Sequence, residues 1–201
     1  MKKIINSRPK GQTGHSYVES HWLVFILKGI IALLAGAFLL FTPSDDVPWL
    51  VTFIGFVLIG LAVVEVGNMF YRRIRQRDWG IPLAVGIFEA AVGITMILIA
   101  RESHVVHIAL LAGYALVRGV TNIVVGFVSF DNATSRFFWV ASGMAGSIIA
   151  FVIFADQGIS ETTFIGVFGT FLMVMGLTDI FFGIHSRDEL KALKSGKKSK
   201  K

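Results

Sequence analysis

The sequence predicts an all-α fold: an integral membrane bundle of six transmembrane helices. First, 54% of the 201 residues are hydrophobic and 16% are charged, whereas a soluble domain carries about 25% charged residues. Second, six apolar stretches have about the 20 residues that a helix needs to cross a bilayer. Third, each stretch carries two small residues seven positions apart. Small residues on one helix face let membrane helices approach closely, so this spacing favours a packed bundle.

The six apolar stretches are separated by short connections, so neighbouring spans should form antiparallel hairpins. We expect the spans at Trp22–Phe41, Pro48–Tyr71, Trp79–Ala100, His107–Phe130, Phe137–Phe154 and Thr163–Ile184. A transmembrane β-barrel would show alternating apolar and polar residues, and these stretches do not alternate. The first stretch is longer than the core of a signal peptide and starts further into the chain, so we expect it to be retained.

The membrane domain is expected at residues 21–186, with hairpins at about 22–71, 79–130 and 137–184. Residues 1–20 are polar and contain Pro and Gly, which predicts a disordered N-terminal segment. The basic tail, residues 187–201, is expected to be disordered after Leu193.

The small residues repeat along the chain. The pairs are Gly29/Gly36, Gly60/Gly67, Gly86/Gly93, Gly119/Gly126, Gly143/Ala150 and Gly176/Gly183. Seven residues make almost two turns, so each pair shares a helix face. The first small residues of the odd spans are 57 positions apart, and those of the even spans are 59 and 57 apart. This spacing predicts three copies of a two-helix hairpin.

Each hairpin crosses the membrane twice and returns to the same side, so the three copies should be parallel. We expect a pseudo-threefold axis along the membrane normal, unlike the inverted repeats of many transporters. In this arrangement small residues face one another, and Phe, Leu and Ile face lipid.

Basic residues predict the orientation. The N-terminal segment, the second connection, the fourth connection and the tail hold four, four, one and seven Lys or Arg residues, against Arg101 alone in the other connections. Sixteen against one places both termini in the cytoplasm. The same clustering does not form a basic surface that could follow a nucleic acid, so no nucleic-acid partner is expected.

Tandem hairpins, a Trp-to-Gly opening of the odd spans and the segment Gly113–Gly119 (GYALVRG) resemble the HdeD family over roughly residues 20–186. The resemblance implies a six-helix protein of the bacterial inner (plasma) membrane, built from a short repeat of unknown function. It also implies no enzyme activity and a role linked to acid resistance. The family has no agreed catalytic residues, so none are carried over.

Ionisable residues within the spans are costly in lipid and are therefore candidate functional sites. They are Lys28, Glu65, Glu89, Arg118 and Asp179. Glu89 is ten residues from Trp79 and Arg118 is twelve from Phe130, so both lie roughly 15–18 Å from the same membrane face. Both are also close to the small-residue faces of their spans. We expect a buried Glu89–Arg118 pair.

Lys28 and Glu65 are also matched in depth, six residues from the same ends of their spans. Lys28 could instead extend its stem to the interface. Glu65 is five residues after Gly60 and therefore off that small face. Glu65 should either face another interface or lie close to lipid and be protonated.

Asp179 lacks an obvious basic partner. With Gly60 as the reference, its repeat equivalents are Asn122 and Val63. Asp179 and Asn122 could form a polar layer together with Ser142 or Thr178. These polar groups either fix the packing of the helices or form an ion or proton path. The outer half offers few titratable groups, which argues against a relay.

His104 and His107 lie three residues apart at the outer end of the fourth span. A metal site needs more ligands than this pair provides, so we interpret it as an interfacial pair and expect no metal or cofactor. A sensor of external acidity is the alternative.

Nucleotide-binding, hydrolase and metalloprotease motifs are absent from the sequence, and without Cys there is no thiolate chemistry. We therefore expect a non-enzymatic membrane protein in acid or envelope stress. One alternative is a small transporter or channel that uses the intramembrane charges. Another is a scaffold that recruits partners through the basic segment Arg72–Arg77 or the tail. The tail could also contact anionic lipids, and a homo-oligomer or a membrane partner is left open.

Overall fold

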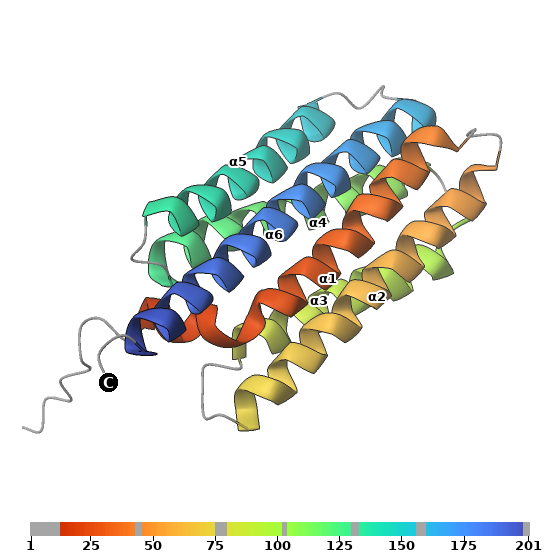
Figure 1. The fold of residues 1–201 in the computed structure, drawn as a ribbon. Helices are drawn as coiled ribbons and strands as arrows, with labels where there is room; N and C mark the ends of the chain where they lie inside the picture. The colour runs from red at the N-terminus through yellow and green to blue at the C-terminus, as the bar shows by residue number, and fades with distance from the viewer. Residues whose placement is uncertain are drawn as a thin grey trace, which may run out of the picture.

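The computed structural model describes residues 13–42, 46–74, 80–101, 104–129, 133–155 and 160–198. It describes only the backbone of residues 13–21, 71–74, 104, 129, 161, 189–190 and 192–198. Six helices account for nearly all of the described chain (Figure 1). They are α1 (Thr13–Phe41), α2 (Val47–Ile74), α3 (Gly80–Leu98), α4 (His104–Ser129), α5 (Ala133–Ala155) and α6 (Glu161–Lys198).

All six helices are long and apolar enough to cross a membrane, which confirms the expected spans to within a few residues. The apolar stretches run from Trp22 to Phe41, Val47 to Phe70, Gly80 to Leu98, Val105 to Val128, Ala133 to Ala155 and Thr162 to Asp188. The described residues contain no strand, in line with the predicted all-α fold.

Two helices continue beyond the expected membrane domain, which differs from the predicted disorder. α1 begins at Thr13 and α6 extends to Lys198. A helix that is already formed is extended at little cost, and Leu, Ala, Glu and Lys in residues 187–198 are good helix formers. Residues 1–12 and 199–201 lie outside the described residues.

Side chains cap the starts of two even helices. Asp46 Oδ1 accepts a hydrogen bond from the backbone N–H of Trp49 at 3.2 Å at the start of α2. Ser160 Oγ accepts from the N–H of Thr163, also at 3.2 Å, at the start of α6. Each cap satisfies an N–H group that has no partner within its own helix.

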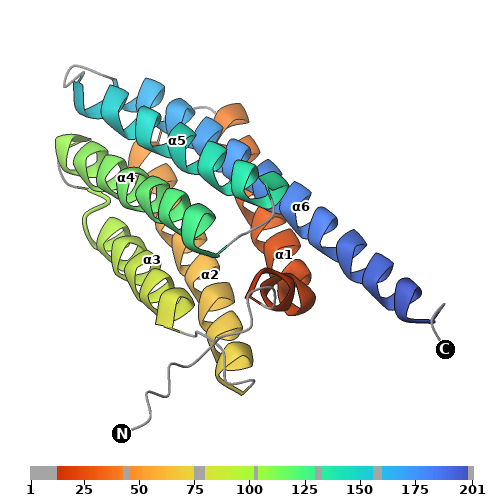
Figure 2. The ribbon, with the colours of Figure 1, turned by 90° about the vertical axis from the view of Figure 1, so that its left-hand side faces the viewer.

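The most extensive helix contacts join one hairpin to the next: α2 with α3, α4 with α5, and α6 with α1. In Figure 1, α6 lies between α5 and α1, so the last helix closes the bundle against the first. The contacts of Gly29 with Gly176 and of Gly36 with Gly169 show that α1 and α6 are antiparallel. The start of α1 and the end of α6 lie at one end of the bundle (Figure 2), which we call the terminal end. The opposite end, where α2, α4 and α6 begin, is the loop end.

Glycines explain how closely these helices approach. A Cβ atom built on Gly29 would lie 2.6 Å from the carbonyl oxygen of Gly176, and one on Gly176 would lie 2.6 Å from that of Gly29. Gly119 and Gly143 are related in the same way across α4 and α5, at 2.7 and 2.5 Å. Only residues without a side chain fit there, which confirms the expected close contact at these positions.

The predicted pair on α2 is wrong. A Cβ atom on Gly60 or Gly67 would meet nothing within 4 Å, whereas one on Gly55 would lie 2.7 Å from the carbonyl oxygen of Gly93. Gly86 instead packs against α2 near Ala62, whose carbonyl oxygen would lie 3.3 Å from an added Cβ. The 57-residue repeat explains this difference, since 119 − 57 = 62. Ala62, not Gly60, is therefore the repeat equivalent of Gly119.

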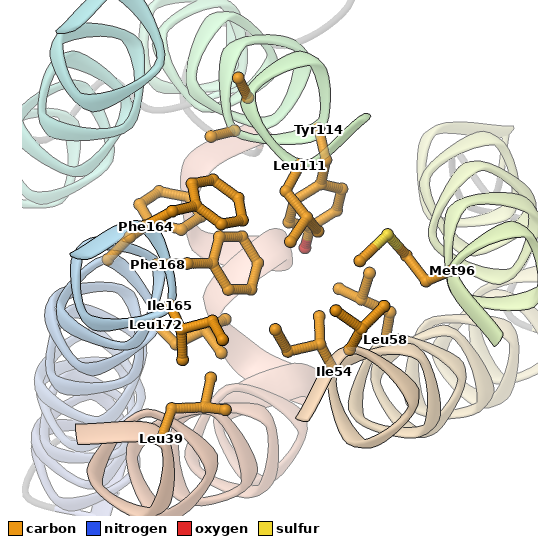
Figure 3. Packing of buried hydrophobic residues seen from close by; sticks show 14 of the residues in the cluster. Leu39, Ile54, Leu58, Met96, Leu111, Tyr114, Phe164, Ile165, Phe168 and Leu172 are labelled. Atoms are coloured by element: carbon orange, nitrogen blue, oxygen red, sulfur yellow. The ribbon is translucent and has the colours of Figure 1, made fainter. Parts of the chain in front are cut away.

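The interior contains two apolar clusters. The larger fills the centre of the bundle toward the loop end, where its side chains converge from several helices (Figure 3). Its most buried members include Ile54, Leu58, Met96, Leu111, Phe164, Phe168 and Leu172. The smaller lies toward the terminal end and consists of Phe25, Val125 and Phe182, with Trp139 packed against them.

The expectation that Phe faces lipid holds for only part of the chain. Phe41, Phe137 and Phe151 are exposed, but Phe164 and Phe168 are buried. The contacts of one glycine backbone with another occur within the pairs α2–α3, α4–α5 and α6–α1. We infer that large aromatic side chains fill the wider space between the pairs, because protein interiors are densely packed.

Candidate functional site

Five ionisable side chains form a layer between the two apolar clusters, and we call it the charged layer. It consists of Lys28 on α1, Glu65 on α2, Glu89 on α3, Arg118 on α4 and Asp179 on α6. On α1 the layer lies between Phe25 and Leu39, and on α6 it lies between Met175 and Phe182. Asp179 is half-buried and the other four are buried. The structure therefore brings together the charges that the sequence placed on five separate spans.

Lys28 and Glu65 form a direct ion pair, in which the ammonium group donates a hydrogen bond to Glu65 Oε1. Asn68 Nδ2 lies 3.4 Å from the other carboxylate oxygen of Glu65 and donates to it. Only 3% of Lys28 is exposed, so it does not extend to the interface. Glu65 faces another helix interface, which was one of its two expected environments. Lipid contact, the other, does not occur.

Arg118 joins two carboxylates through one guanidinium group. Its Nη1 lies 3.7 Å from Glu89 Oε1, and its Nη2 lies 3.7 Å from Glu65 Oε1. The expected Glu89–Arg118 pair is therefore present, and it is linked to Lys28 through Glu65. The planar guanidinium group has five N–H donors in a fixed fork, which suits it to contact two acceptors at once.

Tyr114 is a member of the site that the sequence analysis missed. Its hydroxyl group donates a hydrogen bond to Glu89 Oε1 at 3.3 Å, and its ring stacks on Phe88 with the centroids 6.0 Å apart. Tyr114 precedes Arg118 by four residues, so the two lie one above the other on α4. That spacing was the available signal, because a buried Tyr hydroxyl usually finds a polar partner.

Asn122 and Ser142 interact as suggested, with Asn122 Nδ2 donating to Ser142 Oγ at 3.4 Å. Lys28 and Arg118 act electrostatically on Asp179, although their ion pairs are with Glu65 and Glu89. Thr178 instead donates to the carbonyl oxygen of Val174 on its own helix.

The proposed repeat equivalent Val63 is wrong, because 66% of Val63 is exposed. With a 57-residue repeat, 179 − 57 = 122 and 122 − 57 = 65. Glu65, Asn122 and Asp179 therefore occupy one repeat position on the three even helices. The mistake came from taking Gly60 as the reference residue on α2.

Several buried polar atoms near the charged layer have no hydrogen-bond partner among the described residues. They are Glu89 Oε2, Arg118 Nε, Asn68 Oδ1 and Asn122 Oδ1. A small cavity of about 30 Å³ lies beside them, and its polar lining comes from Glu65, Asn68, Arg118, Thr121 and Asn122.

His107 is not the interfacial residue that we expected. It is buried, and its Nε2 lies 2.6 Å from the carbonyl oxygen of Ile99, just after the end of α3. Since a carbonyl oxygen can only accept, Nε2 must carry the hydrogen. His107 therefore satisfies a carbonyl group that the end of a helix leaves without a partner. The side chain of His104 is outside the described residues, and no cluster of three potential metal ligands occurs within the described ranges.

The chain matches a family model described as a short repeat of unknown function (DUF308) twice, at residues 27–98 and 84–155. The two matches start 57 residues apart (84 − 27 = 57), which is the spacing of the glycines on the odd helices. No curated protein and no solved structure gives a significant match. Because the two matches together cover residues 27–155 of 201, the chain belongs to the DUF308 family of short repeats of unknown function.

Proposed function

We propose that this chain is a non-enzymatic, multi-pass protein of the bacterial inner membrane, of the HdeD type, that supports the membrane during acid or envelope stress. The DUF308 repeat and the six apolar helices support a membrane protein of this kind. The observation that carries the proposal is the pairing within the charged layer: Arg118 and Lys28 contact the carboxylates of Glu65 and Glu89. Such pairing suits a closed bundle better than an open pore.

The packing on the loop side of the charged layer supports the same conclusion. Ile54, Leu58, Met96, Leu111 and Phe168 are all completely buried there. An ion would have to leave water and cross this dry region, which is costly. In this proposal the bundle does not conduct ions and has a structural role in the membrane.

We further propose that the three hairpins are parallel and related by a pseudo-threefold axis along the membrane normal. Three close antiparallel helix pairs and a 57-residue repeat support this arrangement. The distribution of Lys and Arg supports a cytoplasmic location for both termini. The terminal end of the bundle is then the cytoplasmic end.

The test is complementation of a strain that lacks the gene. We expect the deletion to lower survival after an acid challenge and the wild-type chain to restore it. Gly176→Leu should fail to restore survival, because a side chain there collides with the α1 backbone. Gly60→Leu is the matched control, because its Cβ would meet nothing within 4 Å. Unchanged survival of the deletion strain at low pH and under other envelope stress would refute the proposed role.

A small transporter is the second candidate, and the cavity beside the charged layer is the observation that favours it. Reconstituted wild-type protein would then carry an ion or proton flux across a liposome membrane. Glu89→Gln and Asp179→Asn would abolish the flux while the bundle stays folded. The leading proposal instead expects no flux from either the wild-type chain or the variants.

A further inference from the structure

The cavity beside the charged layer lies on its terminal side. Residues from the starts of α3 and α5 and from the terminal-side halves of α1, α2 and α4 line it, including Phe25, Pro82, Val85, Val125 and Trp139. Ile81, also in the lining, is 46% exposed and lies next to the first residue of α3. Ile81 is the most exposed residue of the lining, so we infer that the cavity is nearest to the surface at the start of α3.

The repeat explains why the cavity lies at this point. Positions 25, 82 and 139 are 57 residues apart on the odd helices, and positions 68, 125 and 182 are 57 apart on the even helices. Two of these positions hold Pro82 and Asn68, both in the cavity lining.

The aromatic members of the same two sets pack against one another. The ring of Phe25 lies edge-on to those of Phe182 and Trp139, with centroids 4.8 and 5.8 Å apart. Pro82 stands where the other copies carry Phe25 and Trp139, and Asn68 stands where they carry Val125 and Phe182. These smaller side chains leave the α2–α3 side of the bundle unfilled.

Three of the unpartnered polar atoms belong to residues that line this cavity. Arg118 Nε is a donor, and Asn68 Oδ1 and Asn122 Oδ1 are acceptors. A water molecule accepts up to two hydrogen bonds and donates two, so water in the cavity can serve both the donor and the acceptors. One buried water needs about 10–15 Å³ of such space, and the cavity offers about 30 Å³. There is room for about two waters.

The charge of the layer also favours water. Lys28 and Arg118 contribute two positive charges, and Glu65, Glu89 and Asp179 contribute three carboxylates. The formal sum is −1 (2 − 3) when all five are ionised. An uncompensated charge at membrane depth is stabilised by water that penetrates to it. If one carboxyl group is instead protonated, the proton must reach it from water, so this state also requires a connection to the aqueous phase.

We propose that the cavity is a water-filled vestibule that gives the charged layer access to the aqueous phase at the terminal end of the bundle alone. The apolar cluster around Leu58, Met96 and Leu111 separates the layer from the loop end. This proposal does not depend on the stress role. A closed structural protein and a transporter can both possess a one-sided vestibule.

The natural chain has no Cys, so single thiols can test access directly. We would introduce Thr121→Cys in the vestibule and Leu111→Cys in the apolar cluster. Each variant in sealed membrane vesicles would receive Ag⁺, which is small enough to enter, from one side at a time in chloride-free buffer. The readout is the loss of maleimide labelling after denaturation. Ag⁺ from the terminal side should block Thr121→Cys, whereas Ag⁺ from the loop side should leave it free. Leu111→Cys should remain free from both sides.

Pro82→Phe should fill the vestibule, because it places an aromatic residue where the other copies have Phe25 and Trp139. Combined with Thr121→Cys, it should slow the Ag⁺ reaction at least tenfold. Val85→Cys places a second, separate thiol in the lining and should show the same one-sided reaction, so the result does not depend on Thr121→Cys alone. Protein that elutes and melts like the parent is required for each comparison. Equal reaction from both sides, no reaction of either lining thiol, or an unchanged rate with Pro82→Phe would overturn the proposal.

Discussion

Arg118 on α4 and Glu89 on α3 face each other inside the membrane domain, with 3.7 Å between Nη1 and Oε1. Both residues are buried, at 6% and 1% exposure. The pair does not stand alone, because the same guanidinium group also lies 3.7 Å from Glu65, which is paired with Lys28. The fold thus links α1, α2, α3 and α4 through four charged side chains.

Loss of Arg118 should destabilise the bundle. Arg118→Leu leaves Glu89 without its basic partner, and removing one member of a buried ion pair typically costs about 3–5 kcal/mol. The double variant Arg118→Leu with Glu89→Leu should recover much of this loss, since it removes the stranded charge as well. Unfolding in mixed detergent micelles measures the free energy. A double variant less stable than Arg118→Leu alone would contradict the pairing.

Glycine substitutions should separate contact positions from open ones. Gly29→Ala brings a methyl group within 2.6 Å of the Gly176 carbonyl oxygen, and overpacking of this kind costs about 1–3 kcal/mol. Gly60→Ala meets no neighbour and should leave stability unchanged or raise it by up to about 1 kcal/mol, because Ala favours a helix. The same unfolding assay compares the two. Equal losses at Gly29 and Gly60 would be incompatible with the close α1–α6 contact.

The hydroxyl group of Tyr114 should contribute modestly to the free energy of unfolding through its hydrogen bond to Glu89. Tyr114→Phe keeps the ring that stacks on Phe88 and removes only the hydrogen bond to Glu89. We expect a loss of about 1 kcal/mol. In a Glu89→Gln background the effect should shrink, because the hydrogen bond then no longer involves a charge. If Tyr114→Phe costs the same in both backgrounds, the hydroxyl group acts elsewhere.

Reporter fusions test the orientation. Fusions in the first, third and fifth connections should be active only when exported, and fusions in the second and fourth connections or at the C-terminus should be active only in the cytoplasm. The reason is the excess of Lys and Arg on one side. A cytoplasmic signal from the first, third and fifth connections would reverse the proposed orientation and place the vestibule on the outside.

The sequence predicted the helices well because hydrophobic length alone determines a membrane span. It also predicted the Glu89–Arg118 pair, since depth along two neighbouring helices can be counted from their ends. The spacing of Tyr114 and Arg118 indicated that Tyr114 lies near the charged layer, but its partner Glu89 on α3 depends on rotamers and crossing angles, which residue counting does not provide.

The error on α2 has a different cause. Gly60 is a small residue at a plausible spacing, but it lies two positions from the repeat position held by Ala62. The same two-residue shift replaced Glu65 by Val63 as the equivalent of Asp179. The role of His107 was missed because a carbonyl group left free at a helix end is visible only once the end of that helix is placed.

The closure of the bundle by α6 against α1 is the central structural claim, and thiol cross-linking tests it most directly. The rings of Phe25 and Phe182 have centroids 4.8 Å apart. Along the sequence, nearly the whole membrane domain lies between these two residues. In native membranes, Phe25→Cys with Phe182→Cys should be joined efficiently by a short bifunctional thiol reagent. The control is Phe25→Cys with Leu98→Cys. Leu98 is the last residue of α3 and lies at the loop end, far from Phe25, so this pair should not be joined. Cross-linking of the first pair no greater than that of the control would contradict the closed bundle.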